Sequence, residues 1–389
     1  MHIHDYRKKG QVIFLLYRIL SPLLACCCLW HSLTVMIWPA QAAAPALPLS
    51  AEAAVLLSAD DGTVLYEKKA DTPLPIASIT KIMTAVIALE YAQSDDKVIT
   101  FTPEMQAEGS SMYLQDGDAL TLTELVKGLM MVSGNDAANA IAIGMAGSQT
   151  AFAALMNRKA QQLGMSHTHF VTPSGLDDEQ HYSTAYDMAL LCRYAMQNEP
   201  FSAIVSQKKI TVHYVYPENK TQLCVNHNKL LSLYDGCIGI KTGFTKKAGR
   251  TLTSCAERDG IRLIAVTLHA PDDWNDHKAL YDYGFARTER KTILSATDRY
   301  ALPVVGGQTD TVAVRPEKDY AVTMIRGSTD IFRTHLMLPH FIYAPVTTHR
   351  AVGEIAVYRN DQKIASVRLL TESPVELQKE EDLWKTKTK

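Results

Sequence analysis

Apolar side chains recur at helical spacing in the stretch that follows Pro73 and Pro75. They follow the i, i+3, i+4, i+7, i+8 pattern of a helix with one core-facing side, at Ile79, Ile82, Met83, Val86 and Ile87. Ser78 and Lys81 stand three positions apart at the start of this stretch, so they share one face of the predicted first turn. Free backbone N–H groups and the positive end of the helix dipole converge there. The pattern therefore predicts a serine placed where an oxyanion can be stabilised.

Strand and helix patterns alternate through the rest of the first 290 residues. They predict a strand–turn–strand hairpin, helices opened by Thr121 and Thr184 as N-caps, and several antiparallel strands. The expected elements cover residues 54–66 (hairpin), 121–145 and 150–205 (helices), 209–216 and 238–245 (strands), 250–269 (hairpin) and 273–283 (helix). A turn-rich loop at 170–176 is expected to interrupt the second helical stretch. Gly284 is expected to end the last helix. This order predicts a layered α/β (α+β) catalytic domain over 43–290 rather than a doubly wound one.

Short alternating strands replace this pattern towards the C-terminus. They are expected at 311–315, 320–326, 354–358 and 363–369, and they predict a small all-β domain over 291–372. The tail, 373–389, has few apolar residues and mixes both charge signs. A solvated helix and a weakly membrane-associating helix are both compatible with that composition.

The first 42 residues have the layout of an export signal. A basic start precedes an apolar run, which ends at Ala40-Gln41-Ala42, a small-residue cleavage site. An uncleaved membrane anchor is the alternative, because the apolar run approaches the ~20 residues that span a bilayer. The chain is therefore expected to act outside the cytoplasm, at the cell wall or at the outer face of the cytoplasmic membrane.

Composition narrows the function further. The 389-residue chain has a formal net charge of −2 and lacks basic blocks, so nucleic acid is not an expected partner. Four cysteines follow the export signal, at Cys192, Cys224, Cys237 and Cys255. Their spacing matches no zinc motif, and we expect buried thiols, although up to two disulfides are open. No metal or cofactor is expected.

Three short motifs appear in order: Ser78-x-x-Lys81, Ser133-Gly134-Asn135 and Lys241-Thr242-Gly243. Their predicted positions are a helix start, a tight turn between two helices and a strand. Ser-x-x-Lys alone is weak, since it recurs at 94–97 and 206–209 in polar surroundings. Each other motif also has a purely structural explanation, but the three together, in this order, form a strong signal.

Residue chemistry suggests one role for each motif. A serine hydroxyl needs a nearby base, and Lys81 can serve if burial and the charge of Lys241 lower its pKa. Ser133 can relay a proton, and Asn135 can hold the amide of a peptide substrate. Lys241 and Thr242 can bind a substrate carboxylate. Two further positions are assigned to the strand: Gly243, which lets the backbone approach the ligand, and Phe244, whose N–H would complete the oxyanion hole with that of Ser78.

On these motifs the chain resembles the serine-type D-alanyl-D-alanine carboxypeptidases, the low-molecular-mass penicillin-binding proteins. Four further stretches resemble that family, at 109–112, 133–137, 226–231 and 282–285. The resemblance implies a penicillin-binding/β-lactamase-like transpeptidase domain. It also implies removal of the terminal D-alanine from peptidoglycan pentapeptides and acylation of Ser78 by β-lactams. The chain departs from the family pattern in two places. Thr172 stands where the family usually has asparagine, and the tail matches the family's amphipathic anchor poorly.

Three rival functions remain at this stage. A β-lactamase would share the acylation, but none of Glu179, Glu199 and Glu218 has the sequence setting of a deacylating glutamate. A non-catalytic β-lactam-binding protein of the cell wall would not need the intact Ser78, Lys81, Ser133 and Lys241. Endopeptidase action on peptide cross-links would use the same residues as the carboxypeptidase.

Overall fold

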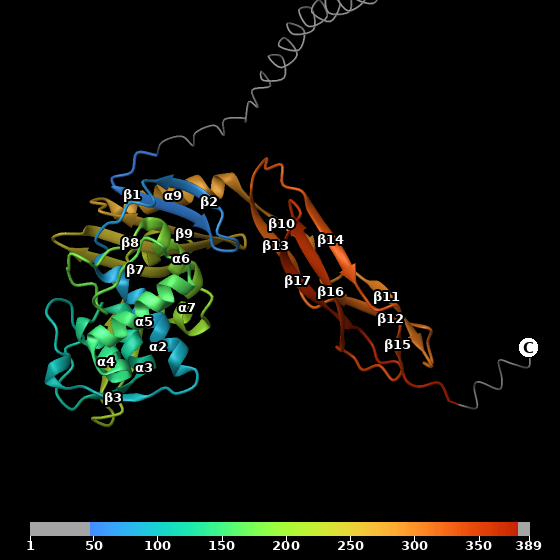
Figure 1. Ribbon diagram of the computed structural model, residues 1–389, viewed down its shortest axis with the longest axis horizontal. Helices are drawn as coiled ribbons and strands as arrows, with labels where there is room; N and C mark the ends of the chain where they lie inside the picture. The colour runs from blue at the N-terminus through green and yellow to red at the C-terminus, as the bar shows by residue number, and fades with distance from the viewer. Residues whose placement is uncertain (1–46, 380–389) are drawn as a thin grey trace, which may run out of the picture. The chain divides into compact units, whose positions relative to one another are not determined.

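The computed structural model of the chain describes residues 47–379. The predicted export signal at 1–42 and residues 380–389 of the predicted tail lie outside these residues. Residues 373–379 of the tail are described and contain no helix; Val375 and Leu377 instead form isolated bridges with Val346 and Gly307. The predicted fold class is confirmed: helices and an antiparallel sheet form the first part of the described chain, and strands form the second (Figure 1).

A five-stranded antiparallel sheet, in the order β2-β1-β9-β8-β7, is the centre of the first part. Its strands are β1 (Ala53–Ser58), β2 (Val64–Lys68), β7 (Cys237–Thr245), β8 (Gly249–Arg258) and β9 (Ile261–Leu268). Side chains alternate across a strand, and in β1 both faces are buried. Val55 and Leu57 join one hydrophobic core, whereas Ala54 and Leu56 join the other. The sheet is therefore covered on both sides, and β7 lies at its edge.

Helices cover the two faces unequally (Figure 1). They are α2 (Lys81–Ala92), α3 (Leu122–Met131), α4 (Asn135–Ala146), α5 (Gln149–Gln162), α6 (Ala185–Ala195), α7 (Glu199–Val205), α8 (Leu230–Leu233) and α9 (Asp273–Arg287). Leu230 of α8 and Leu280 of α9 belong to the smaller core. Helices are present in each predicted helical stretch, but the break in the second stretch is longer than the expected 170–176, since α5 ends at Gln162 and α6 begins at Ala185. The hydroxyls of Thr121 and Thr184 cap α3 and α6 by accepting from the backbone N–H three residues on.

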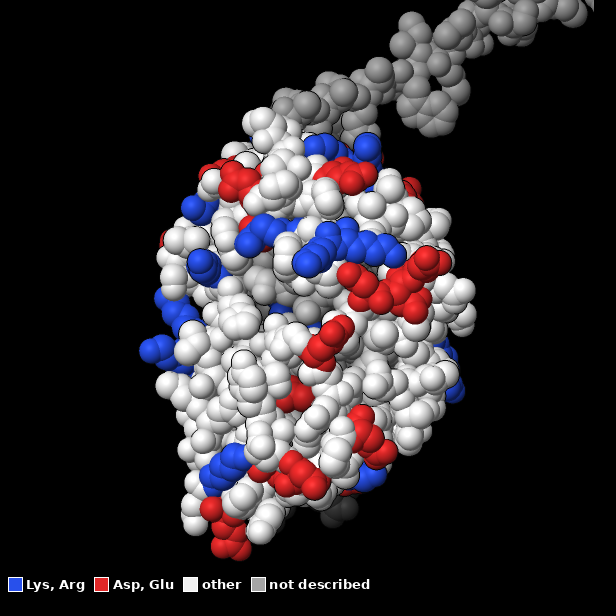
Figure 2. All heavy atoms as spheres, turned by 90° about the vertical axis from the view of Figure 1, so that its left-hand side faces the viewer, with Lys and Arg blue, Asp and Glu red and all other residues white. Residues whose placement is uncertain are grey.

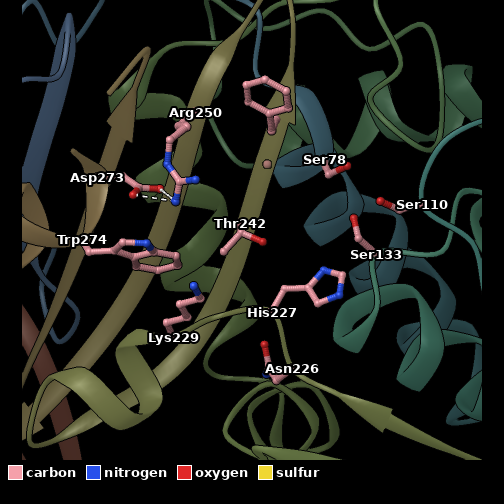
Figure 3. Close-up of a pocket in the computed structure, with 12 residues that line it drawn as sticks. Ser78, Ser110, Ser133, Asn226, His227, Lys229, Thr242, Arg250, Asp273 and Trp274 are labelled. Atoms are coloured by element: carbon pink, nitrogen blue, oxygen red, sulfur yellow. Dashed lines mark hydrogen bonds and ion pairs between the residues drawn. The ribbon is translucent and has the colours of Figure 1, made fainter. Parts of the chain in front are cut away.

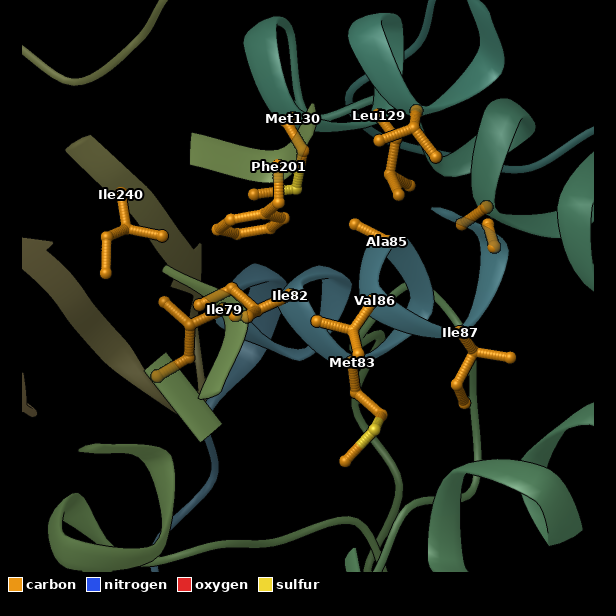
Figure 4. Close-up of a cluster of buried hydrophobic side chains, with 14 of the residues drawn as sticks. Ile79, Ile82, Met83, Ala85, Val86, Ile87, Leu129, Met130, Phe201 and Ile240 are labelled. Carbon is orange, nitrogen blue, oxygen red and sulfur yellow. The ribbon is translucent and has the colours of Figure 1, made fainter. Parts of the chain in front are cut away.

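The predicted one-sided helix after Ser78 is wrong in one respect. Helix α2 is buried on every side from Lys81 to Leu89, because it is central to the helical layer and packs against several other helices (Figure 4). The stripe at Ile79, Ile82 and Val86 is buried as expected, but Thr84 and Ala85 on other sides are buried as well. The apolar spacing predicted one buried face of this helix, whereas the fold buries all of its faces.

The predicted end of the last helix at Gly284 is also wrong. Helix α9 continues to Arg287, and Gly284 lies inside it against β1 and β9. A Cβ at this position would lie 2.6 Å from Leu56 Cδ2 and 2.7 Å from Leu263 Cδ1. The glycine therefore permits close packing of helix on sheet rather than ending the helix.

The second part of the described chain consists of strands. They are β10 (Thr288–Leu294), β11 (Tyr300–Val305), β12 (Thr311–Pro316), β13 (Tyr320–Ile325), β14 (Phe332–Met337), β15 (Ile342–Tyr343), β16 (Ala351–Arg359) and β17 (Gln362–Thr371). A six-stranded sheet runs β14-β16-β17-β12-β11-β15, and β10 pairs with β13. The four predicted strands are confirmed as β12, β13, β16 and β17. Smaller elements complete the described chain: the pairs β3 (Val98–Thr100) with β4 (Ala119–Thr121) and β5 (Lys209–His213) with β6 (Thr221–Val225), and the 3₁₀ turns η1 (Ala77–Thr80) and η2 (Pro103–Met105).

Between residues 47 and 379, no helix has the length and apolar character needed to cross a membrane. All four cysteines of this part are free thiols, and three of them are buried. The expectation of unpaired thiols agrees with this arrangement.

Candidate active site

Ser78 lies in a 3₁₀ turn rather than in the first turn of an α-helix. The turn η1 precedes α2, and Ala77 within it has a φ of +49°. The hydroxyl of Thr251 on β8 donates to the carbonyl oxygen of Ile76 at 3.0 Å and so ties the turn to the sheet. Ser78 itself is half-buried and faces a cleft. The turn thus holds the serine at the edge of the sheet with its side chain accessible.

Lys81 is completely buried beside Ser78. Its Nζ lies 3.0 Å from Ser78 Oγ, 2.7 Å from Asn135 Oδ1 and 2.6 Å from the carbonyl oxygen of Ser174. Burial lowers the pKa of this amine well below its ordinary value, and the charge of Lys241 lowers it further, whereas Asp136 acts in the opposite direction. These are the two causes predicted from the sequence.

The three partners of Lys81 fit a neutral amine that acts as a base. A neutral amine has two hydrogens and one lone pair. The Asn135 and Ser174 oxygens can only accept hydrogen bonds, so they take the two hydrogens. The lone pair is then directed at the Ser78 hydroxyl, as a general base requires.

Ser133 lies in the predicted tight turn between α3 and α4, and Asn135 is the first residue of α4. Ser133 has a φ of +62° and lines the cleft. Asn135 is buried: its Oδ1 accepts from Lys81, and its Nδ2 donates to the carbonyl oxygen of Glu108 at 2.6 Å. In the described part of the chain, Ser133 and Lys81 are not hydrogen-bonded to each other. In this structure Asn135, rather than Ser133, is therefore the direct partner of the lysine from this turn.

The neighbouring Asp136 fixes the loop that faces this turn. Its buried carboxylate accepts from the backbone N–H groups of Met112 and Leu114 and from the hydroxyl of Ser111, at 2.7–3.1 Å. Sequence reasoning assigned no role to this residue, which lies in the family-like stretch 133–137. A buried carboxylate with three donors from another segment holds that loop against the cleft.

The third motif lies on the edge strand β7. Lys241 is buried, its Nζ donates to the carbonyl oxygen of Thr242 at 2.8 Å, and burial lowers its pKa to about 7. Gly243 passes close to the serine turn: a Cβ there would lie 2.9 Å from the backbone nitrogen of Ser78. Phe244 is exposed at the cleft. The structure thus brings all three motifs, and Phe244, together around Ser78.

The cleft has a volume of about 520 Å³ and extends well beyond the predicted residues (Figure 3). Sequence reasoning assigned no role to several of the lining residues: Ser110, Asn226, His227, Lys229, Arg250, Asp273 and Trp274. Stretches 109–112 and 226–231 had been noted only as family-like sequence. Arg250 and Asp273 come from β8 and α9, and no sequence pattern connects them.

Arg250 is a cation held at the wall of this cleft. One terminal nitrogen lies 2.8 and 2.9 Å from the two carboxylate oxygens of Asp273, and the guanidinium lies 5.3 Å from the ring centre of Trp274. Burial raises the pKa of Asp273 although Arg250 opposes the shift. Figure 2 shows basic and acidic side chains interspersed over one face of the molecule rather than a broad patch of one sign. Positive charge at the cleft therefore comes from individual side chains, and the Arg250 guanidinium is one of them, close to β7.

Two family models match this chain, and proteins similar to it are known. The family model described as D-alanyl-D-alanine carboxypeptidase matches residues 39–272, and that of the penicillin-binding protein 5 C-terminal domain matches 289–377. D-alanyl-D-alanine carboxypeptidase DacF of Bacillus subtilis is 31% identical over 338 residues, which is 84% of each chain. The structure of penicillin-binding protein 5 from Haemophilus influenzae is similar with a TM-score of 0.62 at 28% identity, covering 86% of this chain and 99% of that one. A variant of the Streptomyces K15 DD-transpeptidase has a TM-score of 0.59 at 33% identity, covering 62% of this chain and 100% of that one.

Proposed function

The chain belongs to the D-alanyl-D-alanine carboxypeptidase family, and we propose that it removes the terminal D-alanine from peptidoglycan peptides that end in D-Ala-D-Ala. One observation carries this proposal: a buried lysine with a lowered pKa lies 3.0 Å from the hydroxyl of a half-buried, cleft-lining serine. Of the relatives above, the Bacillus subtilis protein is named a D-alanyl-D-alanine carboxypeptidase and the Haemophilus influenzae protein a penicillin-binding protein, which supports the same chemistry.

Acylation begins when the neutral amine of Lys81 takes the proton of Ser78 and the serine oxygen attacks the penultimate D-Ala carbonyl carbon. The N–H groups of Ser78 and Phe244 stabilise the resulting oxyanion, each contributing about 3–4 kcal/mol. The C–N bond then breaks, and the proton passes from Lys81 to the departing amine. Ser133, which lines the cleft, is the proposed relay; its hydroxyl would have to turn towards Lys81, to which it is not bonded in this structure. Water finally attacks the carbonyl carbon of the Ser78 ester, and Lys81 takes a proton from it. The bond between the acyl carbon and the Ser78 oxygen then breaks, Lys81 returns the proton to that oxygen, and the shortened peptide leaves.

Substrate binding uses the edge strand and the cleft wall. The peptide would lie along β7, with its amide near Asn135 and its C-terminal carboxylate near Thr242 and Lys241. Since Lys241 has a pKa of about 7, it carries only part of a charge at neutral pH. Arg250 remains charged and lines the same cleft, so we include it among the groups that bind the carboxylate.

Two measurements test the proposal. Purified protein should release D-alanine from a pentapeptide ending in D-Ala-D-Ala, and Ser78→Ala should abolish the release. A labelled penicillin should form a long-lived covalent adduct with the wild type and none with Ser78→Ala. Absence of both activities in folded wild-type protein would favour a non-catalytic cell-wall protein instead.

Deacylation distinguishes the remaining candidates. Within the described residues, no glutamate lines the cleft, and its only acid, Asp273, is held by Arg250. This composition disfavours rapid β-lactamase turnover, which a nitrocefin assay would detect. Transfer to an amine instead of water is supported by the similarity to the K15 DD-transpeptidase. Parallel assays on pentapeptide, cross-linked muropeptide and an added amine acceptor would separate carboxypeptidase, endopeptidase and transpeptidase activities.

The same function sets expectations for the rest of the chain. We propose that residues 1–42 direct export and that the enzyme acts at the cell wall, outside the cytoplasmic membrane. The domain limits at 43–290 and 291–372 and peripheral membrane association through the tail stay predictions. Cell fractionation with and without residues 373–389 would test the association.

A further inference from the structure

A buried histidine outside the three motifs connects two segments of the active site. His181 is 4% exposed, and its Nε2 lies 2.8 Å from the hydroxyl of Thr80 in the serine turn. Its Nδ1 lies 3.0 Å from the backbone nitrogen of Val171 and 3.3 Å from that of Thr172. The imidazole therefore joins the turn that carries Ser78 to the start of the loop at 171–177.

The hydrogen bonds define one protonation state for this ring. Backbone N–H groups can only donate, so Nδ1 accepts and carries no proton. The Thr80 hydroxyl donates its own hydrogen to the carbonyl oxygen of Ala77 at 2.8 Å, so it accepts from Nε2–H. His181 is thus neutral with both nitrogens satisfied. Its pKa is lowered to about 4, mainly by burial, which agrees with this state.

The loop at 171–177 supplies one of the two fixed acceptors of Lys81. The carbonyl oxygen of Ser174 lies 2.6 Å from Lys81 Nζ, and that of Pro173 accepts from the Thr84 hydroxyl of α2 at 2.6 Å. The loop also fits tightly against the serine turn: a Cβ at Gly175 would lie 2.0 Å from the carbonyl oxygen of Ala77. Any slackening between this loop and the turn would therefore move the Ser174 carbonyl relative to the amine.

We propose that His181 is a positioning residue for the base: through Thr80 and the backbone of Val171 and Thr172 it holds the Ser174 carbonyl on Lys81. This inference rests on the proposed function, because it takes Lys81 as the base of the reaction. The loop then sets the direction of the Lys81 lone pair by accepting one of the two amine hydrogens. We call these hydrogen bonds of His181, to Thr80 and to the backbone of Val171 and Thr172, the clamp. Without the clamp, one hydrogen of the Lys81 amine loses its fixed acceptor. The lone pair is then no longer directed at Ser78, and water can reach the buried amine.

The charges around the two groups decide the sign of the expected pH effect. Lys241 of β7 and Asp136 of α4 act on Lys81 in opposite directions, and burial is the largest cause of its lowered pKa. Asp178, His169, Asp177 and Lys81 face His181. Because burial dominates at Lys81, hydration after loss of the clamp would raise the pKa of the amine. Acylation would then require a higher pH.

Two variants test the clamp from its two ends. Thr80→Val removes the hydroxyl with little change in shape, and His181→Asn keeps an acceptor near Nδ1 but cannot reach Thr80. We expect each variant to be acylated by labelled penicillin about 10- to 100-fold more slowly at pH 7, as for other small displacements of catalytic groups. We also expect the pH midpoint of acylation to shift to higher pH. Thr80→Ser, which restores the hydroxyl, should recover both the rate and the midpoint.

A second buried histidine provides the matched control. His277 is fully buried and bonded through both ring nitrogens, to Ser254 and Thr267, on the other side of the sheet. His277→Asn should lower thermal stability while keeping the wild-type acylation rate and midpoint. Variants of Thr80 and His181 that lose only stability, or that acylate slowly with an unchanged midpoint, would overturn the proposal. Failure of the proposed function itself would instead be seen in the wild type, as absence of acylation and of D-alanine release.

Discussion

Replacing Gly243 with alanine tests how closely β7 must approach the serine turn. The new Cβ would lie 2.4 Å from Thr251 Oγ1 and 2.9 Å from the Ser78 nitrogen. Ordinary contact begins at 3.4 Å, so the strand and the turn must separate by about half an ångström at that nitrogen. The Thr251 hydroxyl must also move, although it holds the turn through the carbonyl of Ile76. One methyl group therefore disturbs both the oxyanion donor and its anchor.

The expected cost follows from the role of that nitrogen. Catalytic groups must be held within about 0.5 Å of their productive geometry, and losing one oxyanion donor lowers kcat by about 10²–10³. We therefore expect the rate constant for acylation by labelled penicillin to fall by roughly 100-fold in Gly243→Ala. Overpacking should also lower the free energy of unfolding by about 1–3 kcal/mol.

Gly284→Ala is the matched control, because it adds the same methyl group on the other side of the sheet. Its Cβ would meet only the ends of the Leu56 and Leu263 side chains within 3 Å. Stopped-flow acylation and urea unfolding should show lowered stability in both variants but slow acylation only in Gly243→Ala. A near-wild-type acylation rate in Gly243→Ala, or equal slowing in the control, would refute the assignment of Ser78 N as an oxyanion donor.

Three further predictions follow from the same contacts. Arg250→Ala should raise KM about 10- to 100-fold for peptides with a free C-terminal carboxylate, because that factor corresponds to the loss of one hydrogen bond between charged groups. An equal rise in KM for C-terminally amidated peptides would contradict this. Asp136→Asn should lower the free energy of unfolding by about 2–4 kcal/mol in urea titrations, since donors from the 111–114 loop lose a buried carboxylate; an unchanged midpoint would contradict it. The pKa values of His277 and His181 fall to about 3 and 4 in the folded state, so the unfolded chain binds more protons below pH 6.5. Stability should therefore fall by about 1 kcal/mol per pH unit for each histidine between pH 6 and 4.5, and His277→Asn should reduce that slope in urea titrations.

The sequence was sufficient to predict elements whose cause is local. Thr121 and Thr184 were expected to cap helices because their hydroxyls can reach a backbone N–H three residues on, and they do. The hairpin turn at Asp259-Gly260 was likewise predictable from its own residues. Local patterns could not predict the burial of α2 on all sides or the packing of Gly284, because both depend on which distant segments surround them.

The same limit applies to the active site. The three motifs predicted which residues meet around Ser78, and burial with the charge of Lys241 predicted the lowered pKa of Lys81. Ser174 contributes only a backbone carbonyl, which has no sequence signature, and His181 acts through Thr80 from a hundred residues away. Asn135 was expected to hold substrate, but its oxygen is already bonded to Lys81. Partners that act through the backbone or through long-range contacts are identified only once the fold is known.

The two buried lysines make acylation depend on the charge of the ligand. Burial is the main cause of the lowered pKa of Lys81, and protonation of Lys241, whose own pKa is about 7, lowers it further because the two lysines repel each other. A ligand carboxylate near Lys241 favours the protonated form of Lys241, but its own negative charge also attracts the Lys81 ammonium, so its two effects on the pKa of Lys81 oppose each other. The pH dependence of ligand capture is the clearer measurement, because a free-acid penicillin loses its ammonium partner when Lys241 is deprotonated. We expect the second-order rate constant of acylation to fall more steeply above pH 7 for the free acid than for a penicillin methyl ester. If the two pH profiles have the same shape, the carboxylate does not act through Lys241, and Arg250 is then left as the cation that receives it.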